Sequence, residues 1–218
     1  DRVIVFLDKS DPIDDKQYYL NPDFFQEDKT NLKYKKNISD RSITFSLLKI
    51  IGNFLDEKRR DIKYRYLISK KYKTNFFDLS HNQVIAFKSI GNRRFISSYY
   101  TNIDKWNNET KKYLLFSINQ LKELEQYLKE KDIRLDIFLY PWSFELVNEN
   151  IRKEYLDYIY KINENQKLNI HNCYDYLLED NILDQLEFIG QNFLYADIHY
   201  NSKGYKVIAE CIRNKLKF

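Results

Sequence analysis

The stretch Leu135-Asp136-Ile137-Phe138-Leu139-Tyr140 is a short apolar run that stops at Pro141. Such a run is typical of a strand that is buried on both faces of a parallel sheet. Two further runs have the same character, Val3-Ile4-Val5-Phe6-Leu7 and the weaker Leu168-Asn169-Ile170-His171. The sequence therefore predicts three parallel strands, at residues 3–7, 135–140 and 168–171.

Helical patterns alternate with these strands. Apolar residues recur every three or four positions in 108–131, 151–162 and 201–216, which predicts one helix with a single apolar stripe in each range. The order βαβαβα predicts an α/β fold, a three-layer α/β/α arrangement with a parallel sheet and right-handed crossovers.

The remaining stretch, residues 21–107, is less regular and contains one predicted helix at 42–58. We interpret 21–107 as a cap-like insertion within a single domain that covers 1–218. In a three-stranded sheet the apolar strand at 3–7 would lie at an exposed edge, with unpaired backbone groups. We therefore expect a segment upstream of Asp1 to complete the sheet.

Composition excludes several classes of protein. The chain has 218 residues, 43% of them hydrophobic, which fits an ordered globular domain. Its 36 Lys and Arg and 32 Asp and Glu are mixed along the chain, so the net charge of +4 predicts no nucleic-acid partner. No stretch approaches the roughly 20 apolar residues of a membrane span.

Cysteine and histidine are sparse. Cys173 and Cys211 allow at most one disulfide, and we expect both in the core. The three histidines and two cysteines show neither Cys-x-x-Cys nor His-x-x-x-His spacing, so we expect no metal. We also expect no cofactor, and the oligomeric state stays open.

The segment Tyr195-Ala196-Asp197-Ile198-His199-Tyr200-Asn201-Ser202-Lys203-Gly204-Tyr205 directly precedes the last predicted helix. A carboxylate two residues from a histidine can fix the tautomer of the imidazole and stabilise its charged form, which is half of a hydrolytic triad. The alternative is a surface loop in which Asp197 and His199 only form hydrogen bonds within a turn.

This segment resembles the C-terminal block of the SGNH/GDSL hydrolases, a family with a flavodoxin-like fold, in which Asp and His precede the last helix and Asn and Gly follow. The resemblance implies that His199 is the general base and that Asp197 orients it. The family commonly has two residues between Asp and His, whereas only Ile198 intervenes here, as in branches that resemble alginate O-acetyltransferases.

Two other segments fit the same resemblance. The end of Val3-Ile4-Val5-Phe6-Leu7-Asp8-Lys9-Ser10-Asp11 is similar to the family's third block, which implies that Ser10 donates to the oxyanion and that Asp11 contacts substrate; a simple turn is the alternative. Phe138-Leu139-Tyr140-Pro141-Trp142 is similar to a strand end of exported family members. It implies that Tyr140 and Trp142 bind substrate, although Trp142 could equally serve in packing.

The family's Gly-Asp-Ser block and its oxyanion glycine are absent from this chain and, by the resemblance, would precede residue 1. Ser80, in Phe76-Phe77-Asp78-Leu79-Ser80-His81, lacks the preceding glycine and strand, so we interpret it as a loop or cap serine rather than the nucleophile. His81 and His171 are interpreted as structural.

The resemblance thus implies a serine-type ester hydrolase or O-acyltransferase acting on an acylated carbohydrate or cell-envelope glycan. It also implies a location in the cell envelope or periplasm. The alternative is a non-catalytic module on the same fold, which binds carbohydrate or acts in assembly. The sequence does not name the sugar or the acyl group.

Overall fold

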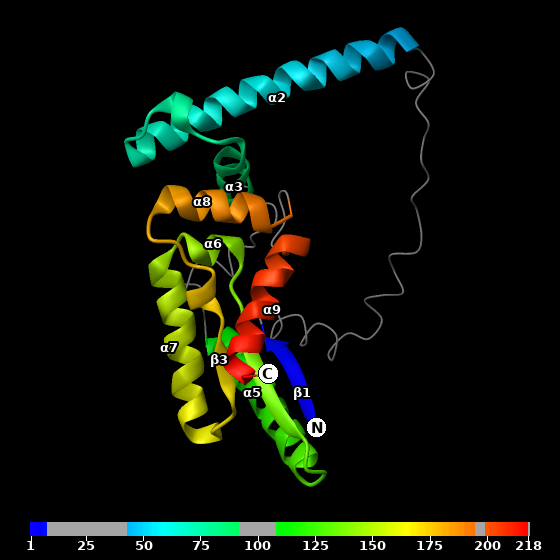
Figure 1. Cartoon of the computed structure of the whole chain (residues 1–218), viewed down its shortest axis with the longest axis vertical. Helices are drawn as coiled ribbons and strands as arrows, with labels where there is room; N and C mark the ends of the chain where they lie inside the picture. The colour runs from blue at the N-terminus through cyan, green and yellow to red at the C-terminus, as the bar shows by residue number, and fades with distance from the viewer. Residues whose placement is uncertain (8–42, 92–107, 195–198, 218) are drawn as a thin grey trace.

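The computed structural model describes residues 1–7, 43–91, 108–194 and 199–217. Three strands form one sheet: β1 (Arg2–Leu7), β2 (Arg134–Leu139) and β3 (Ile170–Asn172). The helices around them are α2 (Ile43–Tyr72), α3 (His81–Gly91), α5 (Asn108–Lys129), α6 (Ser143–Leu146), α7 (Glu149–Gln166), α8 (Ile182–Asn192) and α9 (Ser202–Leu216). Short 3-10 turns are η4 (Phe76–Asp78) and η6 (Tyr174–Tyr176). The fold is therefore α/β (Figure 1).

β2 lies between β1 and β3, and both pair with it in parallel. Val3 is opposite Leu135, and Ile137 is opposite Ile170. The three predicted strands and their parallel direction are thus confirmed. β2 ends just before Tyr140 and Pro141, because proline lacks the N–H that a further ladder bond would need.

The two faces of the sheet are covered by different helices. Successive strand residues point to opposite faces, and Val3, Val5 and Leu7 pack into a core that α5 and α7 complete. On the other face, Phe138 of β2 and Cys173, just after β3, pack with α8 and α9 in a cluster that we call the second core. In Figure 1, α9 lies in front of the sheet and α5 behind it. On the α9 side, Ile4 and Phe6 of β1 remain 36% and 45% exposed.

The three helices predicted at 108–131, 151–162 and 201–216 are confirmed as α5, α7 and α9. Their apolar stripes are buried: Leu114, Ile118 and Leu128 in α5; Tyr155 and Ile159 in α7; Ile208, Cys211 and Leu216 in α9. Asparagine side chains cap two of them, Asn148 at α7 and Asn201 at α9. These caps satisfy backbone N–H groups that have no partner within the helix.

The helix predicted at 42–58 is longer than the sequence pattern indicated, because α2 continues to Tyr72. Ion pairs between Arg60 and Asp56 and between Arg65 and Asp61 connect successive turns of the extension. Ile68 is fully buried near the end of the helix. Tertiary packing therefore stabilises a stretch whose apolar pattern is weak.

α3 and α8 were not predicted, and they pack closely together (Figure 1). Gly190 of α8 lies against the backbone of Asn82, whose carbonyl group a Cβ at position 190 would overlap. A glycine is therefore needed for this close approach. Within the predicted insertion at 21–107, the described elements are α2, η4 and α3, and its function as a cap stays a prediction.

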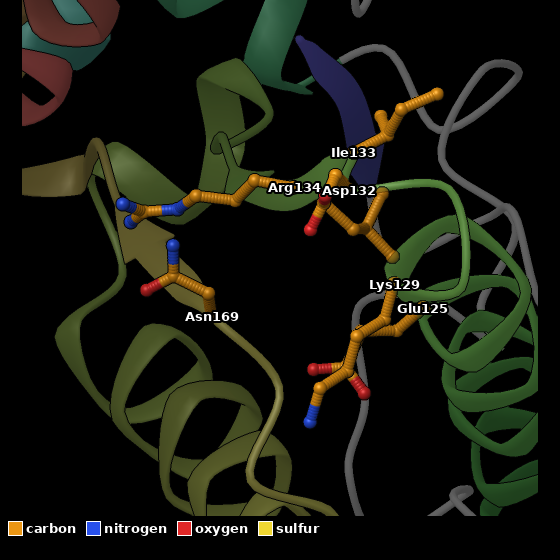
Figure 2. A pocket seen from close by; sticks show the side chains of 7 residues that line it. Glu125, Lys129, Asp132, Ile133, Arg134 and Asn169 are labelled. Atoms are coloured by element: carbon orange, nitrogen blue, oxygen red, sulfur yellow. The ribbon is translucent and has the colours of Figure 1, made fainter.

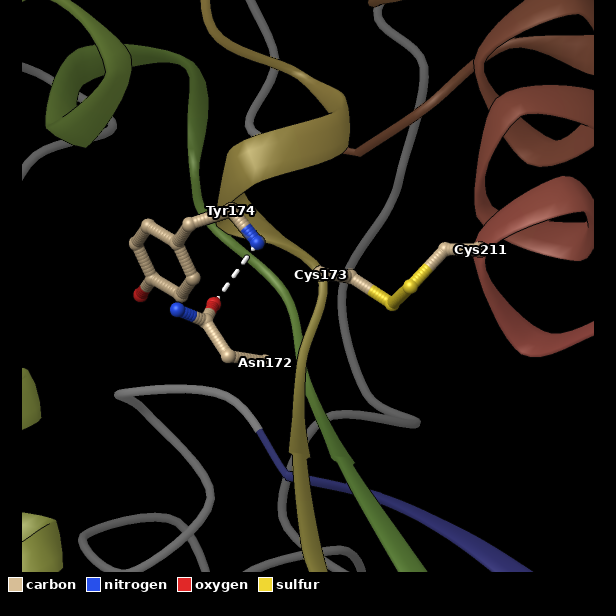
Figure 3. The surroundings of a disulfide bond; sticks show 4 residues. All are labelled: Asn172, Cys173, Tyr174 and Cys211. Carbon is tan, nitrogen blue, oxygen red and sulfur yellow. Dashed lines mark hydrogen bonds between the residues drawn. A yellow bond between two sulfur atoms is a disulfide. The ribbon is translucent and has the colours of Figure 1, made fainter. Parts of the chain in front are cut away.

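A disulfide joins Cys173, just after β3, to Cys211 of α9 (Figure 3). Both cysteines are fully buried, as predicted. Their Cα atoms are 5.9 Å apart. The bond therefore fixes the last helix to the sheet across the second core.

Candidate functional site

The loop that carries His199 is anchored at both ends. The backbone N–H of Leu194 donates to the carbonyl oxygen of His199 at 2.9 Å, and Phe193 forms an antiparallel bridge with Tyr200. The hydroxyl group of Tyr200 donates to the carbonyl oxygen of Pro141 at 2.6 Å. His199 itself is exposed. The loop is thereby tied to the chain that leaves the carboxyl end of β2.

Asn201 joins this loop to both α8 and α9. Its Nδ2 donates to the carbonyl oxygens of Gln191 at 2.8 Å and Phe193 at 3.2 Å. Its Oδ1 accepts from the backbone N–H groups of Lys203 at 2.9 Å and Gly204 at 3.2 Å. One side chain therefore caps α9 and holds the end of α8, and it fixes where the His199 loop enters the last helix.

An apolar pocket of about 240 Å³ lies beside this loop. Its described lining consists of Phe6, Tyr140, Tyr200, Tyr205 and Ile208. The ring centroids of Tyr140 and Tyr200 are 5.9 Å apart, and those of Phe6 and Tyr140 are 6.0 Å apart. Aromatic walls of this kind can enclose an acyl chain or stack on the apolar face of a sugar ring.

The residues that follow Pro141 form a buried polar cluster. Trp142 is 2% exposed, and its backbone N–H donates to Oε2 of Glu145 at 2.9 Å. The hydroxyl group of Tyr174 donates to the same oxygen at 3.3 Å. Burial, followed by the nearby Glu145 carboxylate, raises the pKa of Tyr174 well above its usual value, so this hydroxyl keeps its proton. Trp142 thus packs in the interior, and its stacking on substrate stays a prediction.

Ser80 caps the first turn of α3. Its Oγ accepts from the backbone N–H of Gln83 at 3.0 Å, while its own N–H donates to Oε1 of Gln83 at 2.8 Å, which is a capping box. The same Oγ donates to Glu187 of α8, which also accepts from Nδ2 of Asn82 at 2.7 Å. These bonds give Ser80 a structural role at the start of α3, which was not predicted although Ser-x-x-Gln is the sequence signal for it.

His171 belongs to a polar cluster near the amino end of the sheet. Its Nε2 lies 2.7 Å from Oδ1 of Asp136, and its ring stacks on Phe138 with centroids 4.6 Å apart. The fully buried Asp136 also forms ion pairs with Arg2 at 3.1 Å and Arg134 at 3.0 Å. A buried carboxylate needs such partners, so the cluster supports a structural role for His171.

A second cavity, of about 500 Å³, opens at this amino end (Figure 2). Figure 2 shows Arg134 and Asn169 on one side of it and Lys129 and Glu125 of α5 on the other. The lining mixes basic and acidic side chains, so it favours neither an anionic nor a cationic ligand. Parallel sheets bind ligands beyond the carboxyl ends of their strands, so we place the candidate site at the His199 loop instead.

Three predicted site residues, Ser10, Asp11 and Asp197, lie outside the described residues, and their roles stay predictions. Four residues that line the apolar pocket were not predicted as site residues, namely Phe6, Tyr200, Tyr205 and Ile208. The only sequence signal for Phe6 is its place in the alternating pattern of β1. No family model, curated protein or solved structure matches this chain.

Proposed function

We propose that this chain forms the histidine-bearing part of a serine-type ester hydrolase or O-acyltransferase of the SGNH/GDSL kind, with a three-layer α/β/α fold. Its substrate is an acylated carbohydrate or a cell-envelope glycan, and its nucleophile is a serine upstream of Asp1. The observation that carries the proposal is the exposed His199 on a loop that Tyr200 ties to Pro141 beside an aromatic pocket.

The chemistry assigns one step to each residue. The upstream serine Oγ attacks the acyl carbon while His199 takes its proton, and Ser10 donates a hydrogen bond to the oxyanion. The sugar oxygen then leaves with the proton from His199. Water or a second sugar hydroxyl attacks the acyl-enzyme and gives its proton to His199, which passes that proton to the serine oxygen as the serine is released. Asp197 orients the imidazole throughout.

The pocket supplies the substrate contacts in this proposal. Tyr140 lines it, and its apolar walls suit the acyl group or one face of the sugar ring. Asp11 is the further substrate contact that the resemblance implies, whereas Trp142 is 2% exposed and packs in the interior.

The open part of the sheet also fits the proposal. Within the described residues β1 is an edge strand of the sheet, and its Ile4 and Phe6 are partly exposed on the α9 side. In the SGNH/GDSL family, the strand that bears the nucleophile precedes the strand that corresponds to β1. A segment upstream of Asp1 that lay alongside β1 would bring its serine to the edge where the His199 loop lies.

The disulfide favours a location in the cell envelope or periplasm. Disulfides form and persist in oxidising compartments and are rare in reducing ones. The bond between Cys173 and Cys211 is therefore easier to reconcile with an exported protein.

A second function is favoured by the pocket alone. Rings that line a small apolar pocket can bind a sugar without any reaction. A non-catalytic carbohydrate-binding or assembly module would use Tyr140, Tyr200 and Tyr205 in this way. The two functions differ in whether His199 is needed.

The test compares ester turnover by the protein that includes the residues encoded upstream of Asp1 with turnover by its His199→Ala variant. Aryl acetates and an acetylated glycan serve as substrates. Members of a triad act as a unit, so we expect kcat to fall by about a thousand-fold or more. The chain of residues 1–218 alone should be inactive, because in this proposal the attacking hydroxyl belongs to a serine upstream of Asp1.

Two results would contradict the proposed mechanism. Retention of most activity in His199→Ala would remove this residue from the mechanism. Turnover by residues 1–218 that is lost in Ser80→Ala would make Ser80 the nucleophile. Glycan binding without turnover, weakened by Tyr205→Ala and unchanged by His199→Ala, would establish the non-catalytic module.

A further inference from the structure

α2 carries two apolar stripes, and within the described residues only one of them packs on other elements. Tyr64, Ile68 and Tyr72 face α3 and η4 in a small core. The second stripe consists of Ile51, Leu55, Ile62 and Tyr66, which are between 54% and 61% exposed. In Figure 1 the amino-terminal half of α2 extends away from the other described helices.

Basic residues flank the exposed stripe. At 100° per residue its four members fall within an arc of roughly 60°. Lys58 lies on one side of that arc, and Arg59 and Lys63 lie on the other. The three acidic residues of α2, Asp56, Glu57 and Asp61, all lie further round the helix.

The positive charge of the chain is concentrated on this helix. α2 has eight Lys and Arg against three Asp and Glu, a net charge of +5. The remaining 188 residues hold 28 basic and 29 acidic residues. An apolar stripe with cationic borders is the pattern of a helix that lies in the interface of an anionic membrane, with long basic side chains reaching the headgroups.

The first part of α2 has the right length for this position. Ile43–Leu55 contains eight large apolar residues and a single charged one, Lys49. Thirteen residues are too few to cross a bilayer, and an interfacial segment is one of the arrangements that this length allows. Among the described helices, none is long and apolar enough to span a membrane.

A second copy of the chain fits the stripe less well. Pairing of two stripes would bring Lys58, Arg59 and Lys63 of each copy close together. Like charges at such an interface repel and disfavour the pairing. Anionic lipid instead meets both the apolar stripe and its basic borders.

We propose that the exposed face of α2, Ile51, Leu55, Ile62 and Tyr66 with their basic borders, docks the protein on an anionic membrane surface. Docking would hold the globular part beside the membrane without any membrane-spanning segment of the described chain. This inference goes beyond the proposed function and does not depend on it, since it uses neither His199 nor the aromatic pocket.

Flotation with lipid vesicles tests the proposal. The intact chain should bind vesicles of phosphatidylcholine with phosphatidylglycerol, and bind pure phosphatidylcholine much more weakly. Salt near 1 M, where the screening length is about 3 Å, should weaken binding. The variant Ile51→Ser, Leu55→Ser, Ile62→Ser should lose at least ten-fold in affinity, and Arg59→Glu with Lys63→Glu should lose a similar factor.

Matched substitutions elsewhere serve as controls. Phe77→Ser with Tyr127→Ser removes aromatic residues whose exposure falls within the range of the stripe or above it. Lys112→Glu with Lys161→Glu reverses exposed charges on α5 and α7. Both pairs should leave binding unchanged. Circular dichroism checks that each variant stays folded. A Phe54→Trp variant, whose added fluorescence should shift to the blue with anionic vesicles, reports on α2 even if the triple variant unfolds.

Three outcomes would overturn the proposal. The first is a lack of binding to anionic vesicles together with an unshifted Phe54→Trp signal. The second is an equal loss of binding in the stripe variants and in their controls. The third is a dimer, seen by sedimentation without lipid, that the triple variant abolishes, because the occupant of the stripe would then be a second copy.

Discussion

At the scale of single residues, Asn201 is the side chain of the candidate site whose removal we expect to destabilise the protein most. Asn201→Ala removes the cap of α9, which contributes about 0.5–2 kcal/mol. It also removes the two hydrogen bonds from Nδ2 to the carbonyl oxygens of Gln191 and Phe193, which contribute about 0.5–1.5 kcal/mol each. We expect the free energy of unfolding, measured with urea, to fall by about 1–3 kcal/mol. The fall should be smaller than the sum of these contributions, because water can replace some of the lost hydrogen bonds at a partly exposed site.

Asn148→Ala is the matched control, because Asn148 caps α7 through a single bond to the N–H of Ile151. Asn201→Asp keeps the capping oxygen and loses the donors, so its stability should fall between those of the wild type and Asn201→Ala. If Asn201→Ala costs no more than Asn148→Ala, the bonds from Nδ2 contribute nothing and the loop is held by other contacts.

The carboxylate of Glu187 should make the stability of the protein depend on pH. Burial raises its pKa, but hydrogen bonds from Asn82, Ser80 and Gln191 outweigh burial, and the pKa lies below the ordinary value of 4.5. The unfolded chain therefore binds a proton at Glu187 more readily than the folded chain does. The stabilisation is present above about pH 4.5 and is lost as the pH falls through the folded pKa.

The measurement compares Tm at pH 7 and at pH 3 for the wild type and Glu187→Gln. The wild type should have the higher Tm at pH 7, and the gap should shrink at pH 3. Glu210→Gln, an exposed change on α9, is the control and should show no such change in gap. A gap of constant size would mean that the ionised form of Glu187 adds nothing to stability.

Sequence reasoning at this scale succeeded where a local pattern carries the information. Asn201 before an apolar helical stripe is a recognisable cap, and the helix begins there. The hydrogen bond from Tyr200 to Pro141 joins residues 59 positions apart, and no local pattern encodes it. The same holds for the burial of Trp142 and Asp136, which depends on segments distant in sequence.

At the scale of elements, helices with long apolar stripes were predictable and short or charged ones were not. In α5, α7 and α9, apolar residues recur over about three turns or more. α8 is 11 residues long and contains Gly190, which disfavours helix in isolation. It is stabilised by packing against α3, at the point where that glycine allows the close approach. Propensity was therefore overridden by a tertiary contact.

Three glycine substitutions test how elements are positioned. A Cβ at Gly204 would overlap the carbonyl group of Asn192, and a Cβ at Gly190 would overlap that of Asn82, whereas Gly52 has open space around it. We expect Gly204→Ala and Gly190→Ala to lower the free energy of unfolding by about 1–3 kcal/mol, the usual cost of overpacking. Gly52→Ala should be neutral or stabilising, because alanine favours helix.

Nuclear magnetic resonance of the histidine ring protons separates the first two variants. Gly204→Ala shifts the start of α9 and should move the signal of His199, whereas Gly190→Ala should leave it in place. A His199 signal that stays unchanged in Gly204→Ala would mean that the loop is positioned independently of α9. Equal stability of all three variants would contradict the close approaches.

At the scale of the whole molecule, the sheet was predictable because three apolar runs separated by helical patterns allow few arrangements. The placement of α2 and α3 was not, since it depends on contacts of Ile68, Val84 and Gly190 that join distant parts of the chain. The candidate site was predictable only in part. Its loop was found from a local motif, while its pocket combines β1, the end of β2 and α9.

The disulfide gives the prediction for the molecule as a whole. Cys173 and Cys211 are 38 positions apart, and the segment between them includes α8 and the His199 loop. Closing a loop of this length restricts the unfolded chain and stabilises the fold by up to about 4 kcal/mol in the chain-entropy model. Replacing both cysteines by alanine should therefore lower Tm by roughly 5–15 °C.

Incubation of the wild type with reductant before heating should have a similar effect, whereas the double variant should not respond to reductant. Mass spectrometry after alkylation in denaturant tests whether the disulfide is present. If it is, neither cysteine of the wild type should be labelled unless the protein is first reduced. Labelling without reductant would show two free thiols, and the link between the sheet and α9 would then depend on packing of the second core alone.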